Sequence, residues 1–171
     1  MKHQLEIEHQ LMEESEDLSF WDAAFPFLQS LARKQCKFIL IGNIACKYHG
    51  LRVEDCEVDI LVCNEEQDMN LVIETLKEFS WGQNVSLKGQ LCSYASFYLS
   101  VPLCDGAIDI INETAGIEFN EAYQRALNVK FGKLSLKVLH RDDLINNKSL
   151  LDDPRHLDDA IELSMLSSYD V

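Results

Sequence analysis

Three acidic residues stand inside short apolar runs of this chain. Glu57 and Asp59 lie two residues apart in the run EVDILVC (57–63), and Asp109 lies in the run AIDII (107–111). Side chains two residues apart on a β-strand share one face, and a carboxylate among apolar neighbours is costly unless it is paired or bound to a metal. Because hard cations such as Mg²⁺ prefer carboxylate oxygens, the pattern indicates a magnesium site. The alternative is that all three are ordinary residues on a solvent-facing side of a sheet.

A glycine turn precedes these acids. The run KFILI (37–41) is typical of a buried strand, Gly42-Asn43 of a tight turn, and residues 44–49 of a short helix that stops at Gly50. Free main-chain amides at such a turn can hold an anion, and glycine lets a phosphate approach the backbone closely. An ordinary turn gives the same pattern, but the order of turn, paired acids and third acid favours a phosphate site.

These residues must be positioned by strands and helices, and the mixed order of those elements in the sequence predicts a single α+β (α/β mixed) domain. We expect a mixed β-sheet flanked by helices. Apolar spacing predicts helices over 20–35, 64–79, 119–127, 141–151 and 154–166, a hairpin or meander over 81–103, and strands over 57–63, 107–111 and 133–139. Pro26 fits poorly inside a helix, so we expect the first helix to start near it. Residues 1–19 form an acidic tail or helix before the domain at 20–171.

Charge and hydropathy limit the partners. The 171 residues carry a formal net charge of -14. Such a surface repels phosphate backbones, so extended nucleic-acid binding is disfavoured. A nucleotide can still bind where a metal ion reverses the local charge, and the negative charge is also compatible with a protein partner. No apolar run is long enough to span a bilayer, and the charged first residues do not fit a secretory signal. We therefore expect a cytoplasmic protein without membrane contact.

The stretch FILIGNIACKYHGLRVEDCEVDILV (38–62) resembles the opening motif of the minimal nucleotidyltransferases of the DNA polymerase β superfamily. The likeness is closest to the branch with nucleotidyltransferase-like toxins of bacterial abortive-infection and toxin–antitoxin systems. That motif runs from a strand into Gly-Gly or Gly-Ser, a short helix ending in glycine, an arginine, and two acids separated by one residue. The matching residues are Gly42, Gly50, Arg52, Glu57 and Asp59.

The resemblance covers about residues 20–166. The strand AIDII is similar to the one that carries the family's third carboxylate, here Asp109. The segment LHRDDLINNKSLLDDPRHLDDAIEL resembles the family's closing helices, in which a lysine is followed by a basic residue, then Asp or His, then Asp. The matching residues are Lys148, Arg155, His156 and Asp159.

The resemblance implies a magnesium-dependent enzyme that moves a nucleotidyl group from a nucleoside triphosphate such as ATP to an acceptor. That acceptor is a protein, a tRNA or a small molecule. As catalytic and metal-binding residues the resemblance implies Glu57, Asp59 and Asp109, with Asp109 as the general base. As nucleotide-binding residues it implies Gly42, Asn43, Arg52 and Lys148.

Departures from the family pattern favour an alternative function. Asn43 stands where active members carry serine or glycine, Glu57 replaces an aspartate, and one extra residue separates Arg52 from Glu57. Mg²⁺ requires tight octahedral geometry. These differences favour a noncatalytic relative that acts as a nucleotide-binding or protein-interaction module, and a structural domain without a ligand is a third reading.

Several implied site residues also have structural interpretations. A lysine on a helix, such as Lys148, is most often a surface residue, and Arg52 is suited to a salt bridge with Glu54 or Asp55. The residues of the last helix are suited to a network that ties that helix down, namely Arg155, His156 and Asp159.

Overall fold

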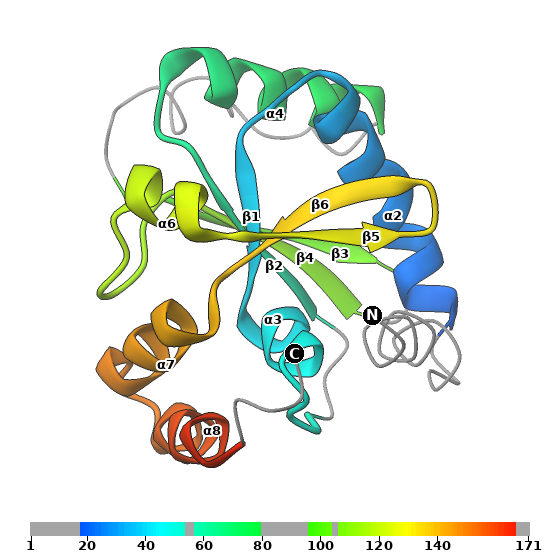
Figure 1. Ribbon diagram of the computed structural model, residues 1–171. Helices are drawn as coiled ribbons and strands as arrows, with labels where there is room; N and C mark the ends of the chain where they lie inside the picture. Colours follow the sequence, from blue (N-terminus) through cyan, green and yellow to red (C-terminus); the bar gives the residue numbers. More distant parts are fainter. Residues whose placement is uncertain (1–17, 54–56, 80–95, 104–105, 167–171) are drawn as a thin grey trace.

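The computed structural model describes residues 18–53, 57–79, 96–103 and 106–166. Its elements are α2 (Leu18–Arg33), β1 (Phe38–Ile41), α3 (Gly42–Tyr48), β2 (Glu57–Val62), α4 (Glu66–Glu78), β3 (Tyr98–Leu103), β4 (Gly106–Ile111), α6 (Phe119–Arg125), β5 (Leu127–Phe131), β6 (Leu134–Val138), α7 (Arg141–Leu150) and α8 (Pro154–Met165). The protein therefore has the mixed α+β class that the sequence predicted, with helices packed around one sheet (Figure 1).

Within the described residues the sheet is mixed, with six strands in the order β3-β4-β2-β1-β6-β5. β1 pairs antiparallel with β2 and parallel with β6, whereas β2 pairs parallel with β4. The outer pairs β3–β4 and β5–β6 are antiparallel. Every residue of β1 is buried, as expected for a central strand that is covered on both faces.

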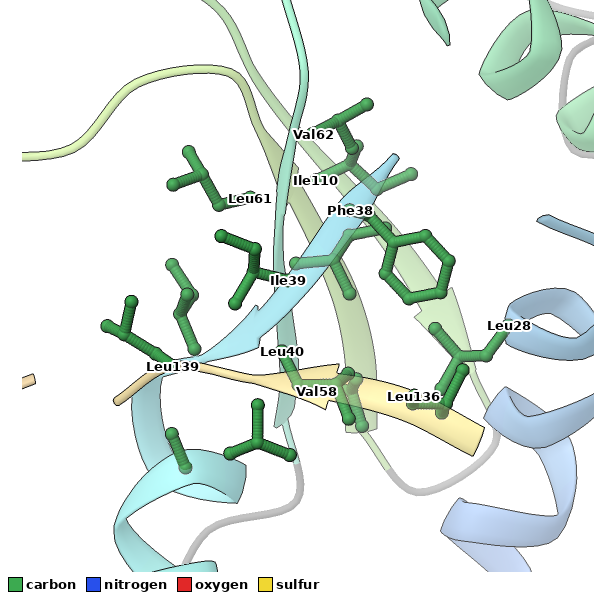
Figure 2. Close-up of a cluster of buried hydrophobic side chains, with 14 of the residues drawn as sticks. Leu28, Phe38, Ile39, Leu40, Val58, Leu61, Val62, Ile110, Leu136 and Leu139 are labelled. Carbon is green, nitrogen blue, oxygen red and sulfur yellow. The ribbon is translucent and has the colours of Figure 1, made fainter. Parts of the chain in front are cut away.

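Apolar side chains fill both faces of the sheet. Leu28 of α2 lies on the same side as Phe38, whereas Ile39 and Leu61 lie on the opposite side (Figure 2). The antiparallel register of β1 and β2 pairs Ile39 with Leu61. Because Asp59 is two residues from Leu61, its side chain shares the face that points away from α2.

α2 continues through Pro26, so the expectation that the helix starts near this proline is wrong. An interior proline costs a helix about 3 kcal/mol. Burial of a large apolar side chain contributes about 1.5–3 kcal/mol each, which outweighs that cost when several are buried. Four residues of α2 are fully buried: Ala24, Phe27, Leu28 and Leu31.

β5 (Leu127–Phe131) was not predicted, because the preceding helical pattern was carried as far as residue 127. In this strand Val129 and Phe131 are buried while Asn128 and Lys130 are exposed, which is the alternation of a half-buried strand. The chain then turns at Gly132 into β6, which corresponds to the strand predicted over 133–139.

Two further predicted segments lie partly or wholly outside the described residues. The later part of the meander predicted over 81–103 forms β3, whereas its earlier part lies outside the described residues. Residues 1–17, predicted as an acidic tail or helix, also lie outside them. None of the described helices combines the length and hydropathy that crossing a bilayer requires.

Candidate functional site

The strands β2 and β4 bring the three predicted acids onto one face of the sheet. The parallel register pairs Asp59 with Asp109 and Glu57 with Ala107. Register partners on neighbouring strands point the same way, and Glu57 precedes Asp59 by two residues, so all three side chains share that face. Neighbouring strands are about 4.8 Å apart, which makes Asp59 and Asp109 direct neighbours.

Asp109 is the buried member of the trio, with 6% of its surface exposed. Its Oδ2 accepts a hydrogen bond from the hydroxyl of Tyr98 at 2.6 Å, whereas its Oδ1 is buried and has no hydrogen-bond partner among the described residues. A buried carboxylate oxygen without a donor costs about 1–3 kcal/mol or more. Asp109 Oδ1 therefore retains the capacity to bind a cation.

Tyr98 is a site residue that the sequence analysis missed. The hydrogen bond to Asp109 is the main cause that raises the pKa of Tyr98, so its phenol is protonated at neutral pH. Alternation within β3 puts Tyr98 and Ser100 on one face. The sequence holds that signal, but only the pairing of Ser100 with Asp109 shows that this face is the acidic one.

The turn at Gly42 and Asn43, which we call the glycine corner, contacts the acidic site formed by Glu57, Asp59 and Asp109. Gly42 is the first residue of α3 and has a φ of +58°. A Cβ atom added at this position would lie 1.9 Å from Asp59 Oδ2. Only glycine combines the left-handed backbone with so close an approach. The carboxylate of Asp59 therefore lies against the main chain of the predicted phosphate turn.

Lys148 is buried, so its interpretation as a surface lysine is wrong. Its Nζ donates to Asp159 Oδ2 at 2.6 Å and to Asn43 Oδ1 at 3.3 Å, and it lies 3.3 Å from Nδ1 of His156. An ammonium can only donate, so Nδ1 of His156 accepts. Burial and, after it, the charge of Lys148 lower the pKa of His156. We call these four residues, Lys148, Asn43, His156 and Asp159, the lysine network.

Asn147 fixes the helix that carries Lys148. Its Nδ2 donates to Thr114 Oγ1 at 2.9 Å and to the carbonyl of Ala115 at 2.8 Å. These bonds tie α7 to the loop that follows β4, the strand of Asp109. The lysine network and the third carboxylate are therefore held by one connected set of elements.

Two predicted arginines do not join this arrangement through contacts among the described residues. Arg52 is exposed, and Glu54 and Asp55, its predicted salt-bridge partners, lie outside the described part of the chain. The side chain of Arg155 is 86% exposed and pairs with Asp153 at 2.7 Å, at the N-cap of α8. Of the predicted closing-helix group, only the histidine and the aspartate reach the lysine.

The three predicted acids do not form a closed ligand cluster. Within the described ranges, the group of three metal-ligating residues whose ligand atoms all lie within 4.8 Å of one another is Cys63, Glu65 and Asp68. Glu57 is exposed and is the first residue of β2. Asp59 and Asp109 are the two acids that the register of β2 and β4 places side by side.

The Cys63 cluster has a structural explanation. Asp68 Oδ1 accepts the backbone N–H of Lys37 at 2.7 Å, and Glu65 pairs with the ammonium of Lys37 at 3.3 Å. Burial raises the pKa of the Cys63 thiol, which disfavours the thiolate that binds metals. These residues tie α4 to the start of β1 and do not belong to the acidic site.

A scan against protein-family models and a search of curated proteins found no match to this chain.

Proposed function

We propose that this protein is a magnesium-dependent nucleotidyltransferase that uses a nucleoside triphosphate. The observation that carries the proposal is the register pairing of Asp59 with Asp109 across β2 and β4, directly beside Gly42. The residues fit Mg²⁺ because every ligand is a carboxylate oxygen and because Asp109 Oδ1 is buried without a hydrogen-bond partner in the part of the chain that the structure describes. Glu57, Asp59 and Asp109 would hold the ion.

Each residue of the site has a role in this reaction. Mg²⁺ held by Glu57, Asp59 and Asp109 would supply charge neutralisation and Lewis-acid polarisation to the triphosphate. Asp109 takes the proton from the attacking hydroxyl, whose oxygen bonds to the α-phosphorus while pyrophosphate leaves with the electrons of the broken P–O bond. We assign the main-chain amides at Gly42 and Asn43 to the phosphates, because this turn lies against Asp59, one of the carboxylates that would hold the ion.

Lys148 contributes through Asn43. Its ammonium donates to Asn43 Oδ1 and to Asp159 Oδ2, so it orients the side chain of the second residue of the turn. Because Asp159 compensates the charge of the ammonium, the contribution of Lys148 is to position Asn43.

One set of observations favours the noncatalytic alternative, a nucleotide-binding module. Glu57 is exposed and does not close with the other two acids, and a transferase requires a complete ligand set. The proposal therefore needs experiments that separate binding from transfer.

Calorimetry with Mg²⁺ alone and with Mg²⁺ plus each common ribonucleoside triphosphate tests binding. We expect heat with the wild type and its loss in Asp59→Asn and Asp109→Asn. Asp142→Asn, which changes an exposed acid on α7, is the matched control and should bind like the wild type. Absence of heat in the wild type for every ligand would refute both the transferase and the nucleotide-binding module.

Transfer is tested by incubating the protein with cell extract and nucleotides labelled at the α-phosphate. Label on a macromolecule or small molecule that depends on Asp59 supports the transferase. Binding without label transfer under varied metals and nucleotides would favour the noncatalytic module.

A further inference from the structure

The hydroxyl of Tyr98 lies at the carboxylate that serves as general base in the proposed function. Tyr98 Oη donates to Asp109 Oδ2 at 2.6 Å, and 65% of the surface of Tyr98 is exposed. A general base must lie within about 2.6–3.2 Å of the atom whose proton it takes. Tyr98 thus meets the geometric requirement for a hydroxyl that Asp109 deprotonates.

Backbone pairing holds Tyr98 in this place. β3 is the outermost strand at one side of the described sheet, its register on β4 sets Ser100 opposite Asp109, and Tyr98 shares the face of Ser100. The N–H of Phe97 donates to Oδ1 of the buried Asn112 at 2.9 Å, which anchors the start of the strand. The backbone pairing therefore places Tyr98 on the face of Asp109, where its hydroxyl reaches that carboxylate.

We propose that Tyr98 is a nucleotidyl acceptor of this protein, which modifies itself; this inference rests on the proposed function. Asp109 takes the phenolic proton, and the Tyr98 oxygen forms a bond to the α-phosphorus of the nucleoside triphosphate. The bond from that phosphorus to the oxygen bridging to the β-phosphate breaks, and pyrophosphate leaves. The product is a nucleoside monophosphate ester of Tyr98.

Charge and exposure support this acceptor. The net charge of -14 disfavours a nucleic acid as acceptor, whereas a hydroxyl on the chain itself has no such barrier. Tyr98 lies on the outermost strand at one side of the described sheet, so a nucleotide attached to its oxygen can extend into solvent. The hydroxyl is already within hydrogen-bond distance of its base, which reduces the entropy cost of the reaction.

Mass spectrometry of the purified full chain tests the proposal. The protein is incubated with Mg²⁺ and each common ribonucleoside triphosphate, its intact mass is measured, and the modified peptide is sequenced. We expect one added nucleoside monophosphate, located on Tyr98, and no addition to Asp59→Asn or Tyr98→Phe. Tyr123→Phe, the same chemical change on α6, is the matched control and should be modified like the wild type.

The outcomes separate this inference from the proposed function. Modification of Tyr98→Phe at the wild-type level, or a label mapped to Ser100, would overturn Tyr98 as the acceptor. So would an unmodified wild type that binds Mg²⁺ with a nucleotide or labels other molecules, and in that case the proposed function stands. Absence of any metal and nucleotide binding in calorimetry would refute both. Peptide mapping of the wild type decides the site even if Tyr98→Phe folds poorly.

Discussion

The substitution Gly42→Ala tests the contact between the glycine corner and the acidic site. Gly42 has a φ of +58°, and a Cβ atom there would meet Asp59 Oδ2 at 1.9 Å. Gly132, in the turn between β5 and β6, has a φ of +63°, and a Cβ atom there would meet nothing within 4 Å. Gly132→Ala therefore reproduces the backbone strain without the collision and is the matched control.

The two variants should differ by the energy of that collision. A left-handed backbone costs a non-glycine residue about 1–2 kcal/mol, which applies to both positions. Overlap with a packed neighbour costs about 1–3 kcal/mol more, which applies only at Gly42. We expect the free energy of unfolding to fall by about 1–2 kcal/mol in Gly132→Ala and by about 2–5 kcal/mol in Gly42→Ala.

Urea unfolding followed by tryptophan fluorescence measures both losses. With a slope of about 2 kcal/mol per molar urea, the midpoint should fall by about 0.5–1 M in Gly132→Ala and by about 1–2.5 M in Gly42→Ala. Because the new methyl group displaces the carboxylate of Asp59, Gly42→Ala should also lose the calorimetric heat of Mg²⁺ binding, which Gly132→Ala should keep.

Equal losses of stability in the two variants would refute the reasoning. That result would mean that only backbone strain matters at Gly42 and that Asp59 does not lie against it. Unchanged Mg²⁺ binding in Gly42→Ala would show that the position of Asp59 at this corner is not needed for the metal site.

Three further predictions concern the surroundings of the site. Asp159→Asn should lower the free energy of unfolding by about 3 kcal/mol, because the substitution leaves the buried side chain of Lys148, which is 2% exposed, without its carboxylate. Lys148→Met should cost less, because the remaining side chain of Asp159 is 23% exposed and partly hydrated. Burial lowers the pKa of His49 below its usual 6.5, so the unfolded chain takes up the proton first and stability falls as the pH drops below about 6.5; His49→Gln should reduce the difference between urea midpoints at about pH 7.5 and about pH 5.5. Burial raises the thiol pKa of Cys36 to about 12 and of Cys46 to about 11, so both should resist iodoacetamide at about pH 8 in the native protein and react in urea, as read by peptide mass mapping.

Each of these predictions has a contrary result. A larger loss in Lys148→Met than in Asp159→Asn would mean that the lysine is hydrated and needs no partner. A wild-type stability that does not change between the two pH values would contradict the lowered pKa of His49. Alkylation of Cys36 or Cys46 in the native protein at the rate seen in urea would contradict their burial.

The sequence by itself determined the local features of the site. Strand periodicity places Glu57 and Asp59 on one face, and the apolar runs around them and around Asp109 mark the strands correctly. The positive φ of Gly42 and the stop at Gly50 follow from the freedom of glycine and were readable as a turn and a helix end. These features depend on neighbours within a few residues, so the local sequence is sufficient to predict them.

Only the tertiary structure decided which distant residues meet. The pairing of Asp59 with Asp109 and the placement of Tyr98 depend on the register of β2, β3 and β4, which the hydrophobic pattern alone leaves open. Lys148 has the sequence context of a surface lysine, and it is buried because α7 packs beside α3 and because Asp159 compensates its charge. Contacts between residues far apart in the chain depend on packing of the whole domain, and no local pattern encodes them.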